Sequence, residues 1–349
     1  MDNTLPLLNI PFGEWAFALD LPEKERYRVR QLHTWVFDRR VKSFSEMSDL
    51  PVDLRQKWDK NFRLRTLTLD HKDVSAQDGT ARLFFKAEDG KMVSCVYLPG
   101  RGGDEDRSSL CLSTQIGCAW ECTFCASGRV KFDRNLSASE IVEQVLQAEE
   151  LYGRHIDSLL FMGMGEPLAN YGNLVQALHI LRSPLGLKYG ARHVTVSTSG
   201  LVSQIRALAR EAPKVNLAVS LHAADDSVRQ RLMPKSAQWP IKELLRSAWD
   251  FQKITGTGRL TFEYILIKGV NDSVRTAQRL ANTLRAKKAW VNLIAYNPVP
   301  GLKFERPSDG TIQNFTNILE ERGVFVRLRK PQGTDIASGC GQLGPARNK

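Results

Sequence analysis

Three of the six cysteines of the chain lie within eight consecutive positions, as Cys118, Cys122 and Cys125. Thiolates at such spacing are typical ligands of iron–sulfur clusters, and a cubane cluster ordinarily takes four of them. Three local thiolates would hold three irons of a [4Fe–4S] cluster and leave the fourth iron open to a small molecule. The crowding also indicates metal ligation in a reducing compartment rather than the disulfide framework of a small secreted protein.

Two other kinds of site use cysteines at short spacing. A structural zinc site takes four ligands, commonly from two Cys-x-x-Cys pairs, and the sequence has no second pair. A thioredoxin-like redox site would use Cys122 and Cys125 alone and would leave Cys118 without a role. The spacing favours the open cluster over both alternatives.

A glycine-rich segment, MGMGEP at 162–167, follows the next expected strand. Glycines let a backbone approach a ligand closely, and Glu166 could receive an ammonium group. Taken alone, the segment is also compatible with an ordinary strand–loop–helix turn, and His222 with a structural histidine. Polar residues end further expected strands, however, at 197–200, 220–222 and 297–298. Together these strand ends would line one mouth of a barrel and form a cofactor pocket.

Strands and helices are expected to alternate from residue 108 onward, and these elements must position the residues named above. Strands are expected at 110–113, 159–162, 194–197, 217–221, 262–267, 291–296 and 324–328. Amphipathic helices are expected near 205–210, 241–251, 274–284 and 312–321, and another begins with a capping box formed by Ser137 and Glu140. This alternation predicts an α/β protein with a parallel sheet, either doubly wound or barrel-like.

The first hundred residues follow a different pattern. Residues 23–40 and 52–62 are expected to be helical, and 66–98 extended, with short strands at 83–85 and 92–97. A loop rich in glycine and acidic residues at 100–106 suggests a boundary. We therefore expect an N-terminal helical accessory domain at 1–65, an extended β linker at 66–106 and the α/β core at 107–349.

Composition narrows the possible partners. The formal net charge of +11 favours a polyanion such as nucleic acid, although a basic, well-solvated surface would give the same number. No apolar run approaches the ~20 residues of a membrane span. The first residues show no basic region followed by an apolar stretch, so the expected location is the cytoplasm.

The cysteine pattern, with Phe124 as the aromatic residue before the third cysteine, resembles the signature of the radical S-adenosylmethionine (SAM) superfamily. In that superfamily the amino and carboxylate groups of SAM chelate the open iron. An electron from the cluster then cleaves the sulfonium to give a 5′-deoxyadenosyl radical. The resemblance implies a partial (β/α) barrel, which the alternation of elements alone left open.

Further segments resemble the RlmN family, dual-specificity methyltransferases that act on C2 of adenosine in 23S rRNA and tRNA. The matching segments are STQIGC at 113–118, MGMGEP at 162–167, TVSTSG at 195–200, AVSLH at 218–222, VNLI at 291–294 with YNP at 296–298, and GCGQL at 339–343. Residues 28–50 also look like the accessory helical domain of that family. The resemblance therefore covers nearly the whole chain.

The resemblance implies a role for each matching residue. The cluster ligands would be Cys118, Cys122 and Cys125. The contacts to SAM would be Gly165, Glu166, Ser197, Ser220, Leu221, His222 and Asn297. Cys340 would become S-methylated, and Cys111 would be the resolving thiol. The implied substrates are 23S rRNA and tRNA, with an unidentified electron donor and a monomeric protein.

The implied chemistry explains the two extra cysteines. C2 of adenine has no lone pair, so ordinary methyl transfer from a sulfonium fails there. One SAM molecule would methylate Cys340, and a second would yield the radical that removes a hydrogen from the S-methyl group. The carbon radical would add to C2 and form a protein–RNA crosslink. After C2 loses its proton, Cys111 would attack the Cys340 sulfur, form a disulfide and release the methylated base.

The sequence departs from the family at one position. Most members carry a glutamate before the Cys111 strand, assigned as the base that removes the C2 proton, and Ser94 stands in its place. Serine without an activating partner is a poor base. One hypothesis is that Asp104, Glu105 or Asp106 reaches the site instead. The other is that this chain is a paralogue with slowed or altered resolution.

Alternative functions remain open on the sequence. The related Cfr family methylates C8, but its members tend to lack the counterparts of Pro167 and Ser199, which favours C2. A radical enzyme acting on a protein or metabolite would not require the Cys111–Cys340 pair, and a non-catalytic Fe–S or zinc module would not cleave SAM. Candidate RNA contacts, each equally compatible with solvated surface, are Arg28, Arg30, Arg39, Arg40, Lys42, Arg129, Lys131 and Arg134.

Overall fold

The computed structural model describes residues 4–100, 107–256, 259–285 and 290–344. One ten-stranded sheet forms its centre, in the order β14-β13-β12-β11-β10-β9-β6-β5-β4-β3. The acidic residues Asp104, Glu105 and Asp106, considered above as substitutes for the missing glutamate, lie outside the described residues.

Seven strands of the sheet run parallel. They are β6 (Ser109–Cys111), β9 (Ser158–Phe161), β10 (Val194–Thr198), β11 (Asn216–Ser220), β12 (Leu260–Leu266), β13 (Trp290–Ala295) and β14 (Phe325–Arg329). The predicted strands from residue 108 onward are all present, each within two residues of its predicted bounds. Because β14 and β3 stand at opposite ends of the strand order, the sheet stays open, and the predicted partial barrel is confirmed.

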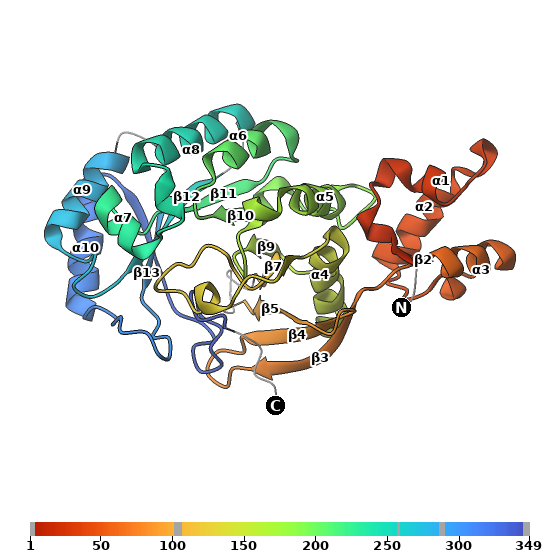
Figure 1. Ribbon diagram of the computed structural model, residues 1–349, viewed down its shortest axis with the longest axis horizontal. Helices are drawn as coiled ribbons and strands as arrows, with labels where there is room; N and C mark the ends of the chain where they lie inside the picture. Colours follow the sequence, from red (N-terminus) through yellow and green to blue (C-terminus); the bar gives the residue numbers. More distant parts are fainter. Residues whose placement is uncertain (1–3, 101–106, 257–258, 286–289, 345–349) are drawn as a thin grey trace.

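Helices cover the outer side of the parallel strands as an arc in Figure 1. They are α4 (Ala138–Tyr152), α5 (Tyr171–Arg182), α6 (Val202–Glu211), α7 (Asp226–Leu232), α8 (Ile241–Thr255), α9 (Val274–Leu284) and α10 (Asp309–Glu321). The predicted capping box begins α4, where the Ser137 hydroxyl accepts from the Glu140 N–H and the Glu140 carboxylate from the Ser137 N–H. A parallel strand that is covered on both faces is buried along its whole length. Strand β12 shows this burial, because all of its residues are buried.

The segment predicted as an extended linker forms three antiparallel strands of the same sheet. These are β3 (Leu67–Val74), β4 (Ala81–Ala87) and β5 (Met92–Leu98), and β5 pairs with β6. Val96 lies opposite Cys111 in this pairing. Since side chains alternate along a strand, Ser94 and Cys111 share one face of the sheet.

The N-terminal helical unit lies at one end of the molecule, beyond α4 and α5 (Figure 1). It contains β1 (Leu5–Pro6), α1 (Trp15–Ala18), α2 (Arg28–His33), a π-helical turn (Thr34–Asp38), α3 (Val52–Asn61) and β2 (Phe62–Arg63). Its small core is aromatic, with the Trp15 ring stacked on His33 at 4.5 Å. Salt bridges from Arg40 to Glu149 and from Arg65 to Glu150 attach it to α4.

A buried carboxylate fixes the junction between this unit and the core. Glu143 of α4 accepts hydrogen bonds from the N–H and hydroxyl of Thr66 and from the N–H of Leu67, at 2.6 to 3.0 Å. The accessory unit is therefore anchored where the chain enters β3. Within the described part of the chain, none of the helices is long and apolar enough to span a membrane.

Candidate radical site and its thiols

The three clustered cysteines lie on a loop that follows β6 and the short strand β7 (Gln115–Ile116). Gly117 begins the loop at a φ of +74°, and a side chain there would lie 2.1 Å from the Lys131 carbonyl. The Cys118 N–H donates to the Val130 carbonyl at 3.1 Å, and the Cys125 N–H to the Cys122 carbonyl at 3.1 Å. The backbone thus folds the loop back on itself and turns its thiols toward one side.

A large cavity opens at the carboxyl ends of the parallel strands, where the sequence predicted a pocket. It has about 970 Å³ of empty space, part of it open to solvent. Nine of the predicted site residues line it: Cys118, Cys122, Cys125, Gly165, Glu166, Ser197, Ser220, His222 and Cys340. Side chains that are distant in sequence, from four strand ends and the C-terminal segment, thus face one space.

Three predicted residues do not line this cavity in the described structure. Leu221 is only 1% exposed and belongs to the apolar core, so a ligand would meet its backbone rather than its side chain. Asn297 lies behind Cys340, to whose carbonyl its amide donates at 3.1 Å. Cys111 lies on β6, within electrostatic range of Cys340.

Glu166 is a buried carboxylate at the edge of the cavity. Its Oε1 accepts from the Leu168 N–H at 3.0 Å and its Oε2 from the Ser199 N–H at 2.7 Å. Burial raises the pKa of Glu166, while these hydrogen bonds oppose the rise. The carboxylate is therefore fixed in place before any ligand arrives, and an ammonium group at the cavity would stabilise its charge.

His222 is held as a neutral ring. Its Nδ1 accepts a hydrogen bond from the Ile265 N–H at 3.1 Å, so the proton of the neutral imidazole sits on Nε2. Burial lowers the pKa of His222 to about 3. The ring also packs edge-on against Phe124 of the cysteine loop, with centroids 4.9 Å apart. His222 therefore supports the loop and offers a donor, not a base, at neutral pH.

The C-terminal segment brings Cys340 to the cysteine loop. The Ala126 N–H donates to the Gly341 carbonyl at 2.7 Å, and the Ser127 hydroxyl to the Leu343 carbonyl at 2.5 Å. The Cys340 thiol opens to the cavity, yet the protein around it raises its pKa, an effect that the positive charge of Arg329 partly offsets.

Cys111 is a partly buried thiol within electrostatic range of Cys340. Burial raises the pKa of Cys111 to about 12, and negative charge on Cys340 contributes to the rise. Arg329 again acts in the opposite direction. The two thiols thus interact electrostatically, share one cation and come from opposite ends of the core sequence.

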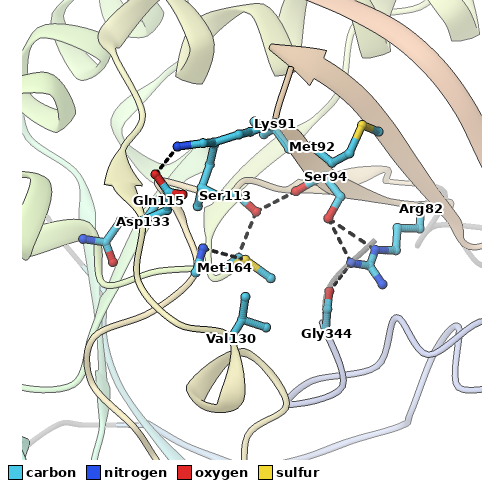
Figure 2. Close-up of a pocket in the computed structure, with 13 residues that line it drawn as sticks. Arg82, Lys91, Met92, Ser94, Ser113, Gln115, Val130, Asp133, Met164 and Gly344 are labelled. Atoms are coloured by element: carbon cyan, nitrogen blue, oxygen red, sulfur yellow. Dashed lines mark hydrogen bonds and ion pairs between the residues drawn. The ribbon is translucent and has the colours of Figure 1, made fainter. Parts of the chain in front are cut away.

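A second cavity lies beside Ser94, on the inner face of the antiparallel strands (Figure 2). The Arg82 guanidinium donates to the Ser94 hydroxyl at 3.2 Å and to the Gly344 carbonyl at 2.6 Å. The Ser113 hydroxyl donates to the Ser94 carbonyl at 2.6 Å. Because the Arg82 guanidinium already donates a hydrogen bond to the Ser94 hydroxyl oxygen, this side chain is not placed to accept a proton.

The three thiols of the cysteine loop face one cavity. In the described residues, no three His, Cys, Asp or Glu side chains converge closely enough to hold one ion. The three thiols nevertheless line one cavity and interact electrostatically with one another. Burial raises the pKa of Cys118 to about 11 and that of Cys122 well above its ordinary value, so metal binding must displace protons.

Two charged residues of the cavity were missed by the sequence reasoning. Glu263 is a buried carboxylate on β12 that accepts from the Asn292 amide at 2.7 Å, and Arg329 ends β14. A signal was available for Glu263, because a lone charge inside an otherwise apolar strand must have a buried partner. Arg329 carries no such signal, since basic residues surround it in the sequence.

Comparisons with known proteins agree with this geometry. Residues 112–281 match the radical SAM superfamily, and residues 15–64 match the ribosomal RNA large subunit methyltransferase N-terminal domain. A dual-specificity RNA methyltransferase RlmN of Anaeromyxobacter dehalogenans is 43% identical, over 98% of this chain and 92% of its own length. The protein of the same name from Syntrophobacter fumaroxidans is 40% identical, over 98% of this chain and 96% of its own length.

A solved structure has the same overall fold. The crystal structure of a radical SAM methyltransferase from Sphaerobacter thermophilus superposes with a TM-score of 0.89 at 39% sequence identity. The match covers 97% of this chain and 98% of the other. Both the helical unit and the open barrel therefore have counterparts in a protein of known structure.

Proposed function

Because this chain belongs to the RlmN family of radical SAM enzymes, we propose that it methylates RNA at C2 of adenosine, with 23S rRNA and tRNA as substrates. The observation that carries the proposal is the proximity of two thiols that are distant in sequence. Cys340 opens beside the cysteine loop, and Cys111 lies within electrostatic range of it. A methyl carrier and a resolving thiol require such a pair.

Membership of the superfamily implies a [4Fe–4S] cluster and SAM as cofactors. We propose Cys118, Cys122 and Cys125 as the cluster ligands, since all three lie on one loop and line one cavity. When bound, these groups supply a methyl group and an organic radical. Glu166 is suited to the amino group of SAM, and the further contacts that we propose are Gly165, Ser197, Ser220, Leu221, His222 and Asn297.

The protein's own thiols carry out the remaining steps. Cys340 must lose its proton to accept a methyl group, and the nearby charge of Arg329 favours the thiolate. Once the crosslinked base has given up its unpaired electron to an acceptor and lost the C2 proton, Cys111 attacks the Cys340 sulfur. A sulfur–sulfur bond forms, the bond between Cys340 and the methylene on the base breaks, and the electron pair of that bond takes up a proton to give the methyl group. Burial keeps Cys111 protonated until that step, which prevents early attack.

The choice of C2 over C8 rests on Pro167 and Ser199. Pro167 opens the helical turn that follows Glu166, and the Ser199 N–H holds the Glu166 carboxylate. Both residues therefore act at the proposed binding site of SAM. Neither tends to occur in the C8-methylating Cfr family, so their presence supports C2.

We further propose that residues 1–65 form the RNA-binding domain, and that 66–106, whose strands β3 to β5 extend the central sheet, join it to the core at 107–349. Among the predicted RNA contacts, Arg28, Arg40 and Arg134 already form ion pairs within the protein. Arg39 packs over the Trp35 ring at 4.0 Å. Arg30, Lys42 and Lys131 form no ion pair in the described structure, so they are the better candidates for phosphates. We expect a cytoplasmic monomer that consumes two SAM molecules per turnover.

The test combines RNA chemistry with protein chemistry. Anaerobically reconstituted, reduced protein is incubated with SAM and with 23S rRNA fragments or tRNA, and both RNA and protein are analysed by mass spectrometry. We expect 2-methyladenosine and 5′-deoxyadenosine. Cys340→Ala should abolish RNA methylation, and Cys111→Ala should trap the protein–RNA crosslink. Cys95→Ala is the matched control, because Cys95 is buried in the core on β5 and should not alter the products.

Two results would overturn the proposal. A methyl group on C8 would assign the chain to the alternative chemistry. Zinc in place of iron, or SAM left intact under strong reductant, would remove the radical mechanism altogether.

A further inference from the structure

Helix α7 lies directly against the cysteine loop. The Thr123 N–H donates to the Leu232 carbonyl, the last of α7, at 2.9 Å. Phe124 packs with Leu232 and Met233 in one apolar cluster, against which Cys122 and Cys125 also pack. The position of the three thiols therefore depends on how α7 is held.

Arg229 holds α7 through a buried guanidinium. Its exposed fraction is 0%, and its Nη2 donates to the Ser199 carbonyl at 2.5 Å and to the Ser220 carbonyl at 3.4 Å. Its Nη1 donates to the Ser236 carbonyl at 2.9 Å. Ser199 and Ser220 stand at the ends of β10 and β11, on the rim of the cavity. One side chain thus joins α7 to two strand ends that face the proposed ligand.

The acceptors of Arg229 are all neutral carbonyls. Across residues 4–100, 107–256, 259–285 and 290–344, it forms no ion pair within 4.0 Å, and its Nε–H has no hydrogen-bond partner. Burying a cation without a close counter-charge is energetically unfavourable. A compensating negative charge is therefore expected nearby.

That charge is available on the cysteine loop. The Arg229 guanidinium interacts electrostatically with Cys122 and with Asp226 in the first turn of its own helix. Of these two, only Cys122 belongs to the cysteine loop, to which α7 is joined by the hydrogen bond from Thr123 to Leu232. Burial lowers the pKa of Arg229 only to about 10, so the side chain remains a cation at neutral pH. Lys235 is a weaker source of charge, because it is about half exposed and already pairs with Glu121 at 2.7 Å.

We propose that Arg229 is a positioning residue for the radical chemistry, whose buried charge raises the reduction potential of the cluster on Cys118, Cys122 and Cys125. This inference rests on the cluster assignment made above. Reduction adds an electron to the cluster, and a fixed cation in a site of low dielectric stabilises the added charge. The hydrogen bonds of Arg229 have a separate effect: they hold the ends of β10 and β11 at the spacing that SAM requires.

The test measures the potential directly. Wild-type, Arg229→Lys, Arg229→Met and Arg229→Gln proteins are reconstituted anaerobically, and the reduced fraction of the cluster is followed by electron paramagnetic resonance at fixed potentials. Loss of the charge in Arg229→Met or Arg229→Gln should lower the ratio of reduced to oxidised cluster at least tenfold, which corresponds to 59 mV for a one-electron couple. Methionine and glutamine differ in polarity, so the two neutral variants are unlike in how well they fold. The measurement needs only one of them to be soluble.

Two further variants separate the effect of the Arg229 charge from the effect of its hydrogen bonds on the position of α7. Arg229→Lys keeps the charge but cannot bridge both carbonyls, so we expect a ratio near that of the wild type together with weaker SAM binding. Leu232→Ala loosens the same helix without changing charge, because Leu232 is an apolar residue of α7 that is only 1% exposed. It should lower stability and shift the ratio less than the neutral variants do, so it measures the effect of the loosened helix alone.

The inference is overturned if the neutral variants shift the ratio no more than Leu232→Ala, or if Arg229→Lys shifts it as much as Arg229→Met. Failure of the proposed function gives a different result. In that case the wild-type protein itself would take up no reducible cluster, whatever residue stands at 229.

Discussion

The Ala126 N–H donates a hydrogen bond to the Gly341 carbonyl at 2.7 Å, and this bond joins the loop of Cys125 to the segment of Cys340. The neighbouring Ser127 hydroxyl donates to the Leu343 carbonyl at 2.5 Å in a buried position. On the opposite side, the Gly333 N–H donates to Asp78, in the turn between β3 and β4. The segment of Cys340, the proposed methyl carrier, is therefore held by both the barrel and its antiparallel extension.

Removing the Ser127 hydroxyl should weaken the contact between the cysteine loop and the segment of Cys340. Ser127→Ala leaves the Leu343 carbonyl buried without its donor, which costs about 1 to 3 kcal/mol of unfolding free energy. We expect SAM cleavage to continue while RNA methylation falls, because Cys340 is held less firmly at the cavity by the hydrogen bonds that remain. The measurement is the ratio of methylated adenosine to 5′-deoxyadenosine.

Ser203→Ala is the matched control for this variant. Ser203 lies exposed on α6, where its hydroxyl contacts only the neighbouring Gln204 in the described structure. The control should keep the wild-type product ratio. Equal product ratios in Ser127→Ala and Ser203→Ala would refute the proposed role of the loop contact.

A side chain at Gly165 should destroy the binding site for SAM. Gly165 has a φ of +104°, and an added Cβ would lie 2.6 Å from Cβ and 2.9 Å from the backbone nitrogen of Gln115. Gly165→Ala must therefore shift the segment that carries Glu166. We expect SAM affinity, measured by equilibrium dialysis, to fall at least tenfold.

Gly172→Ala controls for the addition of a methyl group. Gly172 lies in the first turn of α5 with nothing within 4 Å of its Cβ position. Because alanine favours helix over glycine by about 0.5–1 kcal/mol, this variant should be slightly more stable. Its SAM affinity should be unchanged, and a loss as large as that of Gly165→Ala would contradict the steric argument.

The junction between the helical unit and the core should depend on pH. A hydrogen bond to Glu149 raises the pKa of His155 above its usual 6.5, and the charge of Glu149 adds to the rise. A group whose pKa is raised by folding stabilises the protein below its unfolded pKa. This stabilisation is lost as the pH rises through the folded pKa.

His155→Gln should accordingly destabilise the protein more at pH 5.5 than at pH 8.5. Since the His155 side chain is 57% exposed, the difference should stay within about 1 kcal/mol. Urea unfolding of both proteins at the two pH values measures it. A larger destabilisation at pH 8.5 would show that the charged pair with Glu149 is not responsible.

The parallel half of the fold could be predicted because each strand is a short apolar run between amphipathic helices. Helices α5 and α7 were missed for different physical reasons. Gly172 and Asn173 weaken the helical signal at the start of α5. The seven residues of α7 include two arginines and little apolar periodicity, and the helix is stabilised by tertiary contacts of Arg229 that a local pattern does not contain.

The candidate site was predictable where residues cluster in sequence and not where the fold assembles them. Cys118, Cys122 and Cys125 occupy one loop, so their spacing carried the information. The proximity of Cys111 and Cys340 came only from family resemblance, because the C-terminal segment is brought to the core by tertiary hydrogen bonds with the cysteine loop. Likewise, nothing in the sequence indicated that Arg82 donates to both Ser94 and Gly344.

Restoring the glutamate at position 94 should accelerate the last step of the proposed reaction. Ser94 lies on the same face as Cys111, next to a cavity with about 730 Å³ of empty space that can take a longer side chain (Figure 2). Arg82 would orient the new carboxylate as it now orients the hydroxyl. General bases contribute typically 10²–10⁴-fold to proton removal, so crosslink decay in Ser94→Glu should be at least about tenfold faster.

Ser94→Gln has nearly the same volume as Ser94→Glu but no basic carboxylate, so its crosslink should decay at the wild-type rate. The crosslinked species is followed by denaturing gel in a single turnover, and equal rates in the two variants would show that this chain obtains its base elsewhere.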